Sequence, residues 1–590
     1  MEERKNKILQ AITLALFFTG SFLFFNFSYR YHFIFTEQLQ VFTLTIDHFL
    51  AYLSRPAFLS SYAGDFLTQF YFLSGGAAAV ITVVLFLLWL LTRLLLRKTA
   101  GKEPPVILTL LPPALAWIAI CDPEYPVANI IAILISVSLT LLFLVIKSRK
   151  IRIPAGLILL VLIYISAGSS FYVALLVMIL FELKHDEQPG RFISILLFIL
   201  AATIIPWSLR AVYLLKPGQA FFYLSEMTRI PQVRQFLPVA GLMAALLAVF
   251  FFPSIQYRSS TSIFLARILI IAALLFAGIS MVADFTMEKV LQLDYEARRE
   301  NWNRILDLAG RYDMHNNLAA YYFNMALGKT GRLPEELTEH YQPAATGLFI
   351  PVNANENYLT ITLSNEIYWQ LGDVNASQHS CLLGTIFSPR GQNSRLLKRL
   401  VEINIVNGQY AAAEKFITIL EKTMFHRRWA SGMRKFLYNE SACSSSEWIS
   451  ARRKIIPSKD LLKKGNEYIA TLRMLAGDHP SNRLAVDYLL CFHLLSKDIE
   501  GFLQDFEKYF RPDNSAFLPE AYQEALLVLI IRGERKHEDF SAFRFSPLTV
   551  KNMADFTRLF SESNGDGKLL QKKFGKTYWF YYHFAKMKTD

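Results

Sequence analysis

Long apolar segments separated by short polar turns make up the first 285 residues of the chain. A transmembrane helix needs roughly 20 apolar residues to cross a hydrocarbon core, and seven of these segments reach or approach that length. They lie near residues 8–27, 71–96, 106–121, 127–146, 192–208, 237–253 and 262–285. The pattern therefore predicts a polytopic bundle of membrane-spanning helices over residues 1–285.

The apolar stretch 154–183 has two interpretations. It consists of two shorter apolar runs that meet at Ala167, Gly168, Ser169 and Ser170, so it is either a hairpin or one long, tilted helix. A single span with glycine and serines at its centre would be unusually long and weak in the middle, which favours the hairpin. The hairpin gives about nine spans and puts the two ends of the bundle on opposite sides of the membrane; a single helix gives eight.

The first loop, residues 28–70, is too long for a simple turn. It contains aromatic-rich stretches such as Phe42–Leu50, with apolar residues at helical spacing. Amphipathic helices of this kind lie in the interface between lipid and water. We expect a long extracytoplasmic loop that carries interfacial helices.

From Thr286 onward the pattern changes to pairs of amphipathic helices joined by short polar turns, with almost no alternation typical of strands. Only 13 of the 48 Asp and Glu residues precede Thr286, so residues 286–590 have the composition of a soluble domain. The fold class expected for the whole chain is all-α, with a transmembrane bundle followed by a soluble helical domain.

Three segments of this second half share one spacing, and a fourth is weaker. Their small and apolar positions are Gly372, Val374, Ser377 and Cys381; Gly408, Tyr410, Ala413, Ile417 and Leu420; Val486, Leu489, Ile499, Phe502 and Phe506; and Trp302, Ala319, Phe323 and Ala326. The spacing resembles that of tetratricopeptide (TPR) repeats. The resemblance implies a curved stack of helical pairs whose concave face binds a protein partner. The alternative is an irregular helical domain without a dedicated groove.

The net charge of +13 changes the picture little, because the basic residues of the first half cluster beside apolar runs. Such clusters mark cytoplasmic loops, so no nucleic-acid partner is expected. Arg4, Lys5 and Lys7 precede the first apolar run, which lacks a small-residue cleavage site and reads as an uncleaved signal anchor. We predict a bacterial inner-membrane protein with a cytoplasmic N-terminus and, with nine spans, a periplasmic second domain.

Motifs of the common soluble enzymes are missing from the sequence. It contains no P-loop, HExxH, GxSxG or dinucleotide-binding fingerprint. The four cysteines have neither CxxC spacing nor histidines at metal-ligand intervals, so no metal site and no cofactor is expected, and no divalent cation is indicated. Any chemistry must come from the membrane half.

One short segment, Gly64-Asp65-Phe66-Leu67-Thr68-Gln69-Phe70, resembles the Gly-Asp-x-x-x-Gln-aromatic segment of YfhO-type bacterial membrane proteins, which are related to GT-C glycosyltransferases. The resemblance implies sugar transfer from a polyprenyl-phosphate donor, with Asp65, or Asp47 beside His48, as the catalytic carboxylate. Substrate-binding residues would include Gln69 and His48. With a hairpin at 154–183, Arg210, Arg229 and Arg234 lie on the same side and could hold the donor phosphate.

Each of these residues also has a plainer interpretation. Asp65 could cap the second span, because aspartate is a favoured N-cap. The arginines could anchor lipid headgroups. Asp47 and His48 could form the solvated face of an interfacial helix.

A second resemblance runs over most of the chain. The segments Pro480–Leu490, Leu495–Asp498 and Leu518–Leu526 are similar to those of a family of Bacteroidota integral membrane proteins with a domain of unknown function. That family implies an inner-membrane location without an established activity. Two functions therefore compete: a GT-C-like glycosyltransferase of cell-envelope glycan assembly, and a membrane scaffold whose TPR-like domain recruits envelope proteins.

Overall fold

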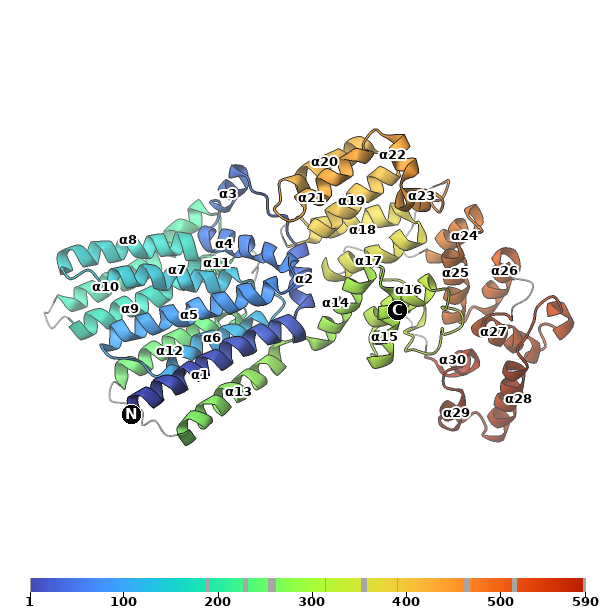
Figure 1. Cartoon of the computed structure of the whole chain (residues 1–590), viewed down its shortest axis with the longest axis horizontal. Coiled ribbons are helices and arrows are strands. Elements are labelled where there is room, and N and C mark those ends of the chain that lie inside the picture. The colour runs from blue at the N-terminus through green and yellow to red at the C-terminus, as the bar shows by residue number, and fades with distance from the viewer. Residues whose placement is uncertain are drawn as a thin grey trace. The chain divides into compact units, whose positions relative to one another are not determined.

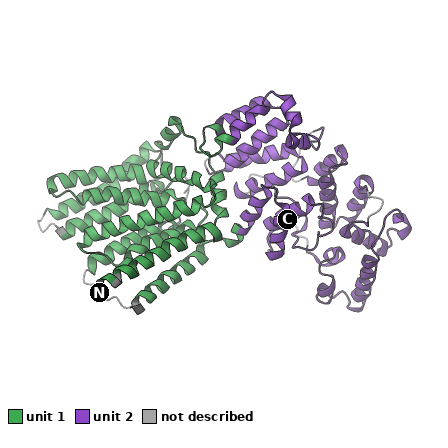
Figure 2. Cartoon of the chain, viewed as in Figure 1, with its two compact units in different colours: residues 1–288, 421–428 green, residues 289–420, 429–590 purple. Residues whose placement is uncertain are grey.

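The computed structural model describes residues 2–185, 190–225, 232–252, 261–312, 315–351, 358–389, 391–459, 467–511 and 517–586. Within these ranges every named element is a helix, and the one β-type pairing is an isolated antiparallel bridge between Thr43 and Thr423. The expected all-α class is confirmed. The chain forms two compact units, residues 1–288 with 421–428 and residues 289–420 with 429–590 (Figure 2).

The first unit is built from long helices, which run roughly parallel to one another in Figure 1, and from short helices in their connections. Its helices are α1 (Glu2–Leu23), η1 (Phe24–Ser28), α2 (Tyr31–Gln38), α3 (Ile46–Tyr52), α4 (Phe58–Thr68), η2 (Gln69–Phe72), α5 (Gly76–Ala100), α6 (Val106–Ile120), α7 (Ala128–Phe143), α8 (Arg149–Ala167), η3 (Gly168–Ser170), α9 (Phe171–His185), α10 (Arg191–Val212), α11 (Pro217–Phe221), η4 (Val233–Phe236), α12 (Leu237–Phe251) and α13 (Thr261–Val282). Each apolar segment identified in the sequence contains one of these long helices, with bounds that differ by a few residues.

Six helical segments among the described residues are long and apolar enough to cross a membrane. They are Lys7–Ser28, Gly76–Ala100, Arg149–Lys184, Arg191–Val212, Val233–Phe251 and Phe264–Val282, and the apolar helices Val106–Ile120 and Ala128–Phe143 are shorter. Many of their apolar side chains, such as Phe276 on α13 and Ile193 on α10, are exposed. Since water would penalise such surfaces, these helices suit a membrane.

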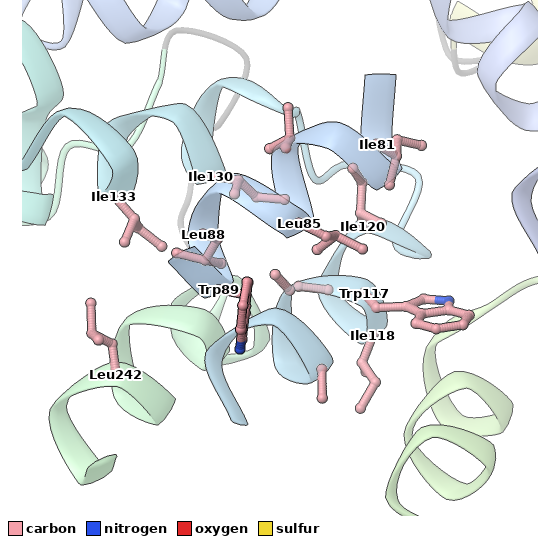
Figure 3. Packing of buried hydrophobic residues seen from close by; sticks show 14 of the residues in the cluster. Ile81, Leu85, Leu88, Trp89, Trp117, Ile118, Ile120, Ile130, Ile133 and Leu242 are labelled. Carbon is pink, nitrogen blue, oxygen red and sulfur yellow. The ribbon is translucent and has the colours of Figure 1, made fainter. Parts of the chain in front are cut away.

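Helix α6 lies at the centre of this unit and is almost entirely buried. Helices α5, α12 and α13 pack against it. Figure 3 shows the apolar side chains that fill the space between these helices, including Leu85 on α5, Trp117 on α6 and Leu242 on α12. Helix α6 is thus surrounded by other apolar helices, which explains why its sequence is apolar on all sides.

Residues 149–185 form two antiparallel helices. Arg152 near the start of α8 pairs with Glu182 near the end of α9, with 2.8 Å between Nε and Oε1, and both side chains are buried. The chain reverses at Gly168, whose φ of +60° suits glycine. A Cβ there would also lie 2.4 Å from the carbonyl oxygen of Tyr223. The geometry is that of the hairpin rather than of one tilted helix.

Basic residues gather at one end of the helices. Lys184 at the end of α9 donates to the carbonyl oxygen of Thr99 at the end of α5 (2.8 Å), and Arg149 at the start of α8 donates to Ser194 at the start of α10 (2.9 Å). The opposite end is marked by the phenol of Tyr29, which donates to the carbonyl oxygen of Cys121 (2.8 Å).

Helix α14 (Phe285–Ala297) follows α13, and its first turn lies at this opposite end. The Glu288 carboxylate accepts the backbone N–H groups of Tyr31 (2.7 Å) and His32 (2.9 Å), which directly follow the first long helix. The chain therefore leaves the last apolar helix at the same end at which it leaves the first. This places the start of the second half opposite the N-terminus of α1.

Replacing Glu288 with glutamine is expected to flatten the pH dependence of stability of the first unit. Burial raises the pKa of Glu288 from 4.5 to about 7, although the N–H groups of Tyr31 and His32 lower it. Because the pKa is raised in the folded state, the stabilisation is complete below about pH 4.5 and is lost as the pH rises through 7. The loss is on the order of 3 kcal/mol. Melting temperatures in detergent at pH 5 and pH 8 test this.

His32 provides the internal comparison for that experiment. Burial lowers the pKa of His32 to about 4, so its contribution is present above pH 6.5 and is lost in acid. Both the wild type and the Glu288→Gln variant keep this opposite dependence. The difference between their melting temperatures at each pH therefore reports on Glu288 alone. An identical pH profile of melting temperature for the two proteins would contradict the assignment.

The second unit consists of shorter helices, many of them in antiparallel pairs. Beyond α14 they are α15 (Trp302–Arg311), α16 (Asn317–Lys329), η5 (Ala344–Gly347), α17 (Tyr358–Leu371), α18 (Val374–Phe387), α19 (Ser394–Val406), α20 (Tyr410–Glu421), α21 (Arg427–Met433), η6 (Arg434–Phe436), α22 (Glu440–Ser445), α23 (Glu447–Arg453), α24 (Tyr468–Asp478), α25 (Arg483–Leu495), α26 (Ile499–Tyr509), α27 (Glu520–Ile531), η7 (His537–Phe540), α28 (Pro547–Glu562), α29 (Gly567–Phe574) and α30 (Tyr578–Phe584).

The three segments of shared spacing correspond to three helical pairs with the same turn. Gly372, Gly408 and Lys497 each stand two residues before the second helix of a pair, and all three have positive φ, at +90°, +71° and +58°. Lysine tolerates this conformation less well than glycine. The third turn therefore keeps the geometry without the glycine that reveals the other two in the sequence.

Candidate functional site in the first loop

Asp65 lies on α4, which packs directly against α7. The residue before it, Gly64, makes this approach close, because a Cβ at Gly64 would lie 2.6 Å from the Cα atom of Ala128. Only glycine allows the two backbones to come so near. Gly64 thus allows the close packing that positions α4, and the next residue, Asp65, carries the carboxylate.

The carboxylate of Asp65 is buried and hydrogen-bonded. The phenol of Tyr52, on α3, donates to its Oδ2 at 2.5 Å, and the side-chain amide of Gln40 donates to its backbone carbonyl oxygen at 3.0 Å. Asp65 stands inside α4, whereas α5 begins after Gly75. The alternative that Asp65 caps the second apolar helix is therefore wrong.

Asp47 and His48 lie on α3 and have different surroundings. Asp47 is exposed. His48 is half-buried, and its ring packs edge-on against Phe42 and Tyr52. Its backbone N–H donates a hydrogen bond to the hydroxyl of Thr45 at 3.3 Å. His48 thus adjoins the tyrosine that binds Asp65, whereas Asp47 faces outward as the plainer interpretation expects.

Gln69 begins the short helix η2 that follows α4. Its side chain is buried and its amide donates to the carbonyl oxygen of Phe66 at 3.3 Å. The residue therefore closes the end of α4 locally. This contact shows a structural role, and substrate binding by Gln69 stays a prediction.

The three candidate arginines are not equivalent. Arg234 pairs with the buried carboxylate of Asp122, with 2.6 Å between Nε and Oδ2. The guanidinium of Arg210 stacks on the exposed ring of Trp207, 3.6 Å from its centre. Arg229 lies outside the described residues. Arg234 is thus committed to an internal ion pair, and Arg210 has the surroundings of a residue at a lipid–water boundary.

Comparison with known proteins places the whole chain in one group. A family model described as "Family of unknown function (DUF6057)" matches residues 4–585. The chain belongs to DUF6057. None of the curated proteins and none of the solved structures matches it. The resemblance of the C-terminal segments to a family with a domain of unknown function is confirmed, and the DUF6057 match spans both compact units.

In this DUF6057 member, two side chains that sequence reasoning missed stand beside the candidate residues. Tyr52 binds Asp65, and Arg55, three residues on, donates to the carbonyl oxygen of Tyr213 at 3.4 Å. Tyr52 is the last residue of α3, and Arg55 lies in the turn between α3 and α4. An arginine and a tyrosine in an apolar interfacial loop were the available signal, but the partner of Tyr52 depends on how α3 packs against α4, and the partner of Arg55 lies far away in the sequence.

A segment from the second half of this DUF6057 chain, residues 421–428, completes the first unit. His426 Nε2 lies 2.9 Å from Glu37 Oε1, and both side chains are buried. The ring of Phe425 stacks on Phe72 with 5.5 Å between centres, and Leu44 N–H donates to the carbonyl oxygen of Lys422. The loop that carries Asp65 is therefore held by residues almost 400 positions away.

No group of three or more His, Cys, Asp or Glu side chains suited to a metal ion occurs among the described residues of this DUF6057 member. The four cysteines are all buried and unpaired. The first loop itself presents a carboxylate, a phenol and an imidazole, with a guanidinium group at Arg55.

Proposed function

We propose that the protein lies in the bacterial inner membrane with the basic end of its first unit in the cytoplasm. The support is the positive-inside rule, applied to the end that carries Arg93, Arg149 and Lys184. The first loop and Glu288 then lie on the extracytoplasmic side. On this topology the helices α1, α5–α10, α12 and α13 cross nine times, and the second unit is periplasmic.

We further propose that the protein is a GT-C-like glycosyltransferase that acts on a polyprenyl-phosphate sugar at the periplasmic face of the inner membrane. The observation that carries this proposal is the buried carboxylate of Asp65, oriented by the Tyr52 phenol within a helical loop at the end of the bundle opposite its basic residues. A carboxylate removed from water and held by a hydrogen bond is positioned to act as a base.

In the proposed reaction Asp65 takes the proton of the acceptor hydroxyl. The acceptor oxygen then forms a bond to the anomeric carbon of the sugar, and the bond between that carbon and the donor phosphate oxygen breaks. The polyprenyl phosphate leaves with the electron pair, and arginines at this end, Arg55 and Arg210, are suited to hold its negative charge.

Transfer from a synthetic polyprenyl-phosphate sugar tests the proposal. The full-length protein is reconstituted in liposomes with donor lipid and with periplasmic glycan fragments as acceptors, and lipid-released sugar is counted. Time-dependent release that needs the native protein supports the proposal. Release no faster than in liposomes with heat-denatured protein, over a panel of sugars, would count against it.

A second candidate function is a membrane scaffold that recruits an envelope protein. The helical pairs of the second unit, with their recurring left-handed turn at Gly372, Gly408 and Lys497, favour it, because TPR-like stacks bind partner chains. Crosslinking of the full-length protein in cells should then give one dominant adduct through the second unit. Adducts spread evenly over both units would contradict the scaffold.

A further inference from the structure

A group of cationic and aromatic side chains lies within the second unit, contributed by α15, α16, α17, α19 and α23. Its members are Trp302, Lys329, Trp369, Arg399 and Arg452, with Glu300, Glu366 and Glu402 as the acidic neighbours. We call it the Lys329–Arg452 cluster. The three cations of this cluster differ in how closely they pair with its carboxylates.

Arg399 is fully balanced. Its Nη2 lies 2.9 Å from Glu366 Oε2, and its Nη1 lies 2.9 Å from Glu402 Oε2. Its guanidinium also stacks on Trp369, 4.5 Å from the ring centre. Both ion pairs thus join this one arginine to the buried or half-buried carboxylates of the cluster, and Glu366 also accepts a hydrogen bond from the side-chain amide of Gln370 at 3.0 Å.

Arg452 is held mainly by neutral groups. Its Nη1 donates to the carbonyl oxygen of Trp369 at 2.7 Å and its Nη2 to the side-chain oxygen of Gln370 at 3.0 Å. The carboxylate of Glu300 lies 3.8 Å away, and its side chain is 59% exposed to solvent. Such a long pair with an exposed partner balances a buried charge only weakly.

Lys329 has even less compensation. Its amine is half-buried, 5.9 Å from the centre of the Trp302 ring, and it makes no ion pair or hydrogen bond with any residue that the structure describes. Burial lowers the pKa of Lys329, and the charge of Arg452 lowers it further. Burial and then Arg399 also lower the pKa of Arg452, to about 10. Burial is the largest cause of both shifts, and the carboxylates of Glu300 and Glu366, which raise both pKa values, offset it only in part.

We propose that Lys329 and Arg452 form a binding site for an oxyanion, a carboxylate or phosphate group of a ligand, beside Trp302 and Trp369. A bound oxyanion would supply the charge that Glu300 does not, and it would accept hydrogen bonds from the amine and from the guanidinium. The tryptophan rings would cover the ligand's apolar part. The site does not depend on the activity proposed for the first loop.

Chemical labelling of Lys329 tests the site. Full-length protein in nanodiscs of zwitterionic lipid is pulsed with acetic anhydride, and acetylation of each lysine is measured by peptide mass spectrometry. Inorganic phosphate or glutarate is added in separate series, each against sodium chloride at equal ionic strength. The reagent attacks only the neutral amine, so an oxyanion that raises the lysine pKa by one unit should slow acetylation about tenfold.

Lys398 provides a matched control, because its amine also lies over a tryptophan, 5.3 Å from the ring centre of Trp429. We expect saturable protection of Lys329 and none of Lys398. Phosphate alone protecting would identify a phosphate site, and glutarate alone a carboxylate site. Arg452→Gln should weaken the protection at least several-fold, whereas Lys398→Gln should leave it unchanged. Equal reactivity of Lys329 in both oxyanions and in chloride would overturn the proposal.

Discussion

Replacing Arg395 with methionine is expected to lower the free energy of unfolding of the second unit by about 3 kcal/mol. Arg395, at the start of α19, binds both oxygens of Asp294 on α14 at 2.9 Å, and both side chains are buried. Burial would raise the pKa of Asp294, but Arg395 and Arg298 hold it below its ordinary value. Without Arg395 the buried carboxylate keeps only Arg298 and the Tyr322 phenol.

Hydrogen exchange of peptides from α14 and α19, with urea as denaturant, measures this loss in the full-length protein. Arg434→Met is the control, because Arg434 pairs with Glu414 on the surface and an exposed pair contributes at most about 1 kcal/mol. Adding Asp294→Asn to Arg395→Met should restore part of the stability, since it removes the stranded charge. If Arg395→Met and Arg434→Met lowered the free energy of unfolding equally, the buried pair would stabilise the second unit no more than the exposed pair does.

Replacing Asp65 with asparagine is expected to reduce the proposed sugar transfer about 10²- to 10⁴-fold. Asparagine has nearly the same shape and can still accept the hydrogen bond of Tyr52, but it cannot take a proton from an acceptor hydroxyl. The melting temperature should therefore change little while the rate falls. The measurement is the release of sugar from the polyprenyl-phosphate donor in liposomes.

Asp47→Asn is the matched control for that experiment. Asp47 belongs to the same loop and carries the same carboxylate, but it is exposed on α3. Its replacement should leave the transfer rate within about twofold, as is usual for a surface change. A folded Asp65→Asn protein with the full transfer rate would remove Asp65 from the mechanism.

The sequence was sufficient to place the helices of the first unit, for a simple physical reason. Stretches such as 237–253 have no polar face, so they can form only helices surrounded by apolar neighbours. The Gly-Asp pair at residues 64 and 65 also drew attention to the loop in which the structure buries a carboxylate. It did not reveal Tyr52 as the partner of Asp65, because a contact between two helices of one loop depends on the packing of both.

Several features were hidden because they join residues far apart in the chain. In the sequence Arg234 was a candidate to bind a phosphate, but in the structure it forms an ion pair with Asp122. His426 gave no signal at all, although it reaches Glu37 in the first loop. The third turn, at Lys497, could be identified only from the spacing of its neighbours, since a lysine does not indicate a positive φ.

By itself, the sequence determined that this protein is all-helical, with an apolar first half and a charged second half, because hydrophobic periodicity and segment length are local properties. Only the tertiary structure decided that residues 149–185 turn back on themselves, that Glu288 brings the end of the last apolar helix beside the end of the first, and that Lys329 makes no ion pair with a residue in the described part of the chain. These features depend on contacts between residues far apart in the sequence, and burial determines how strongly the charged groups in those contacts interact.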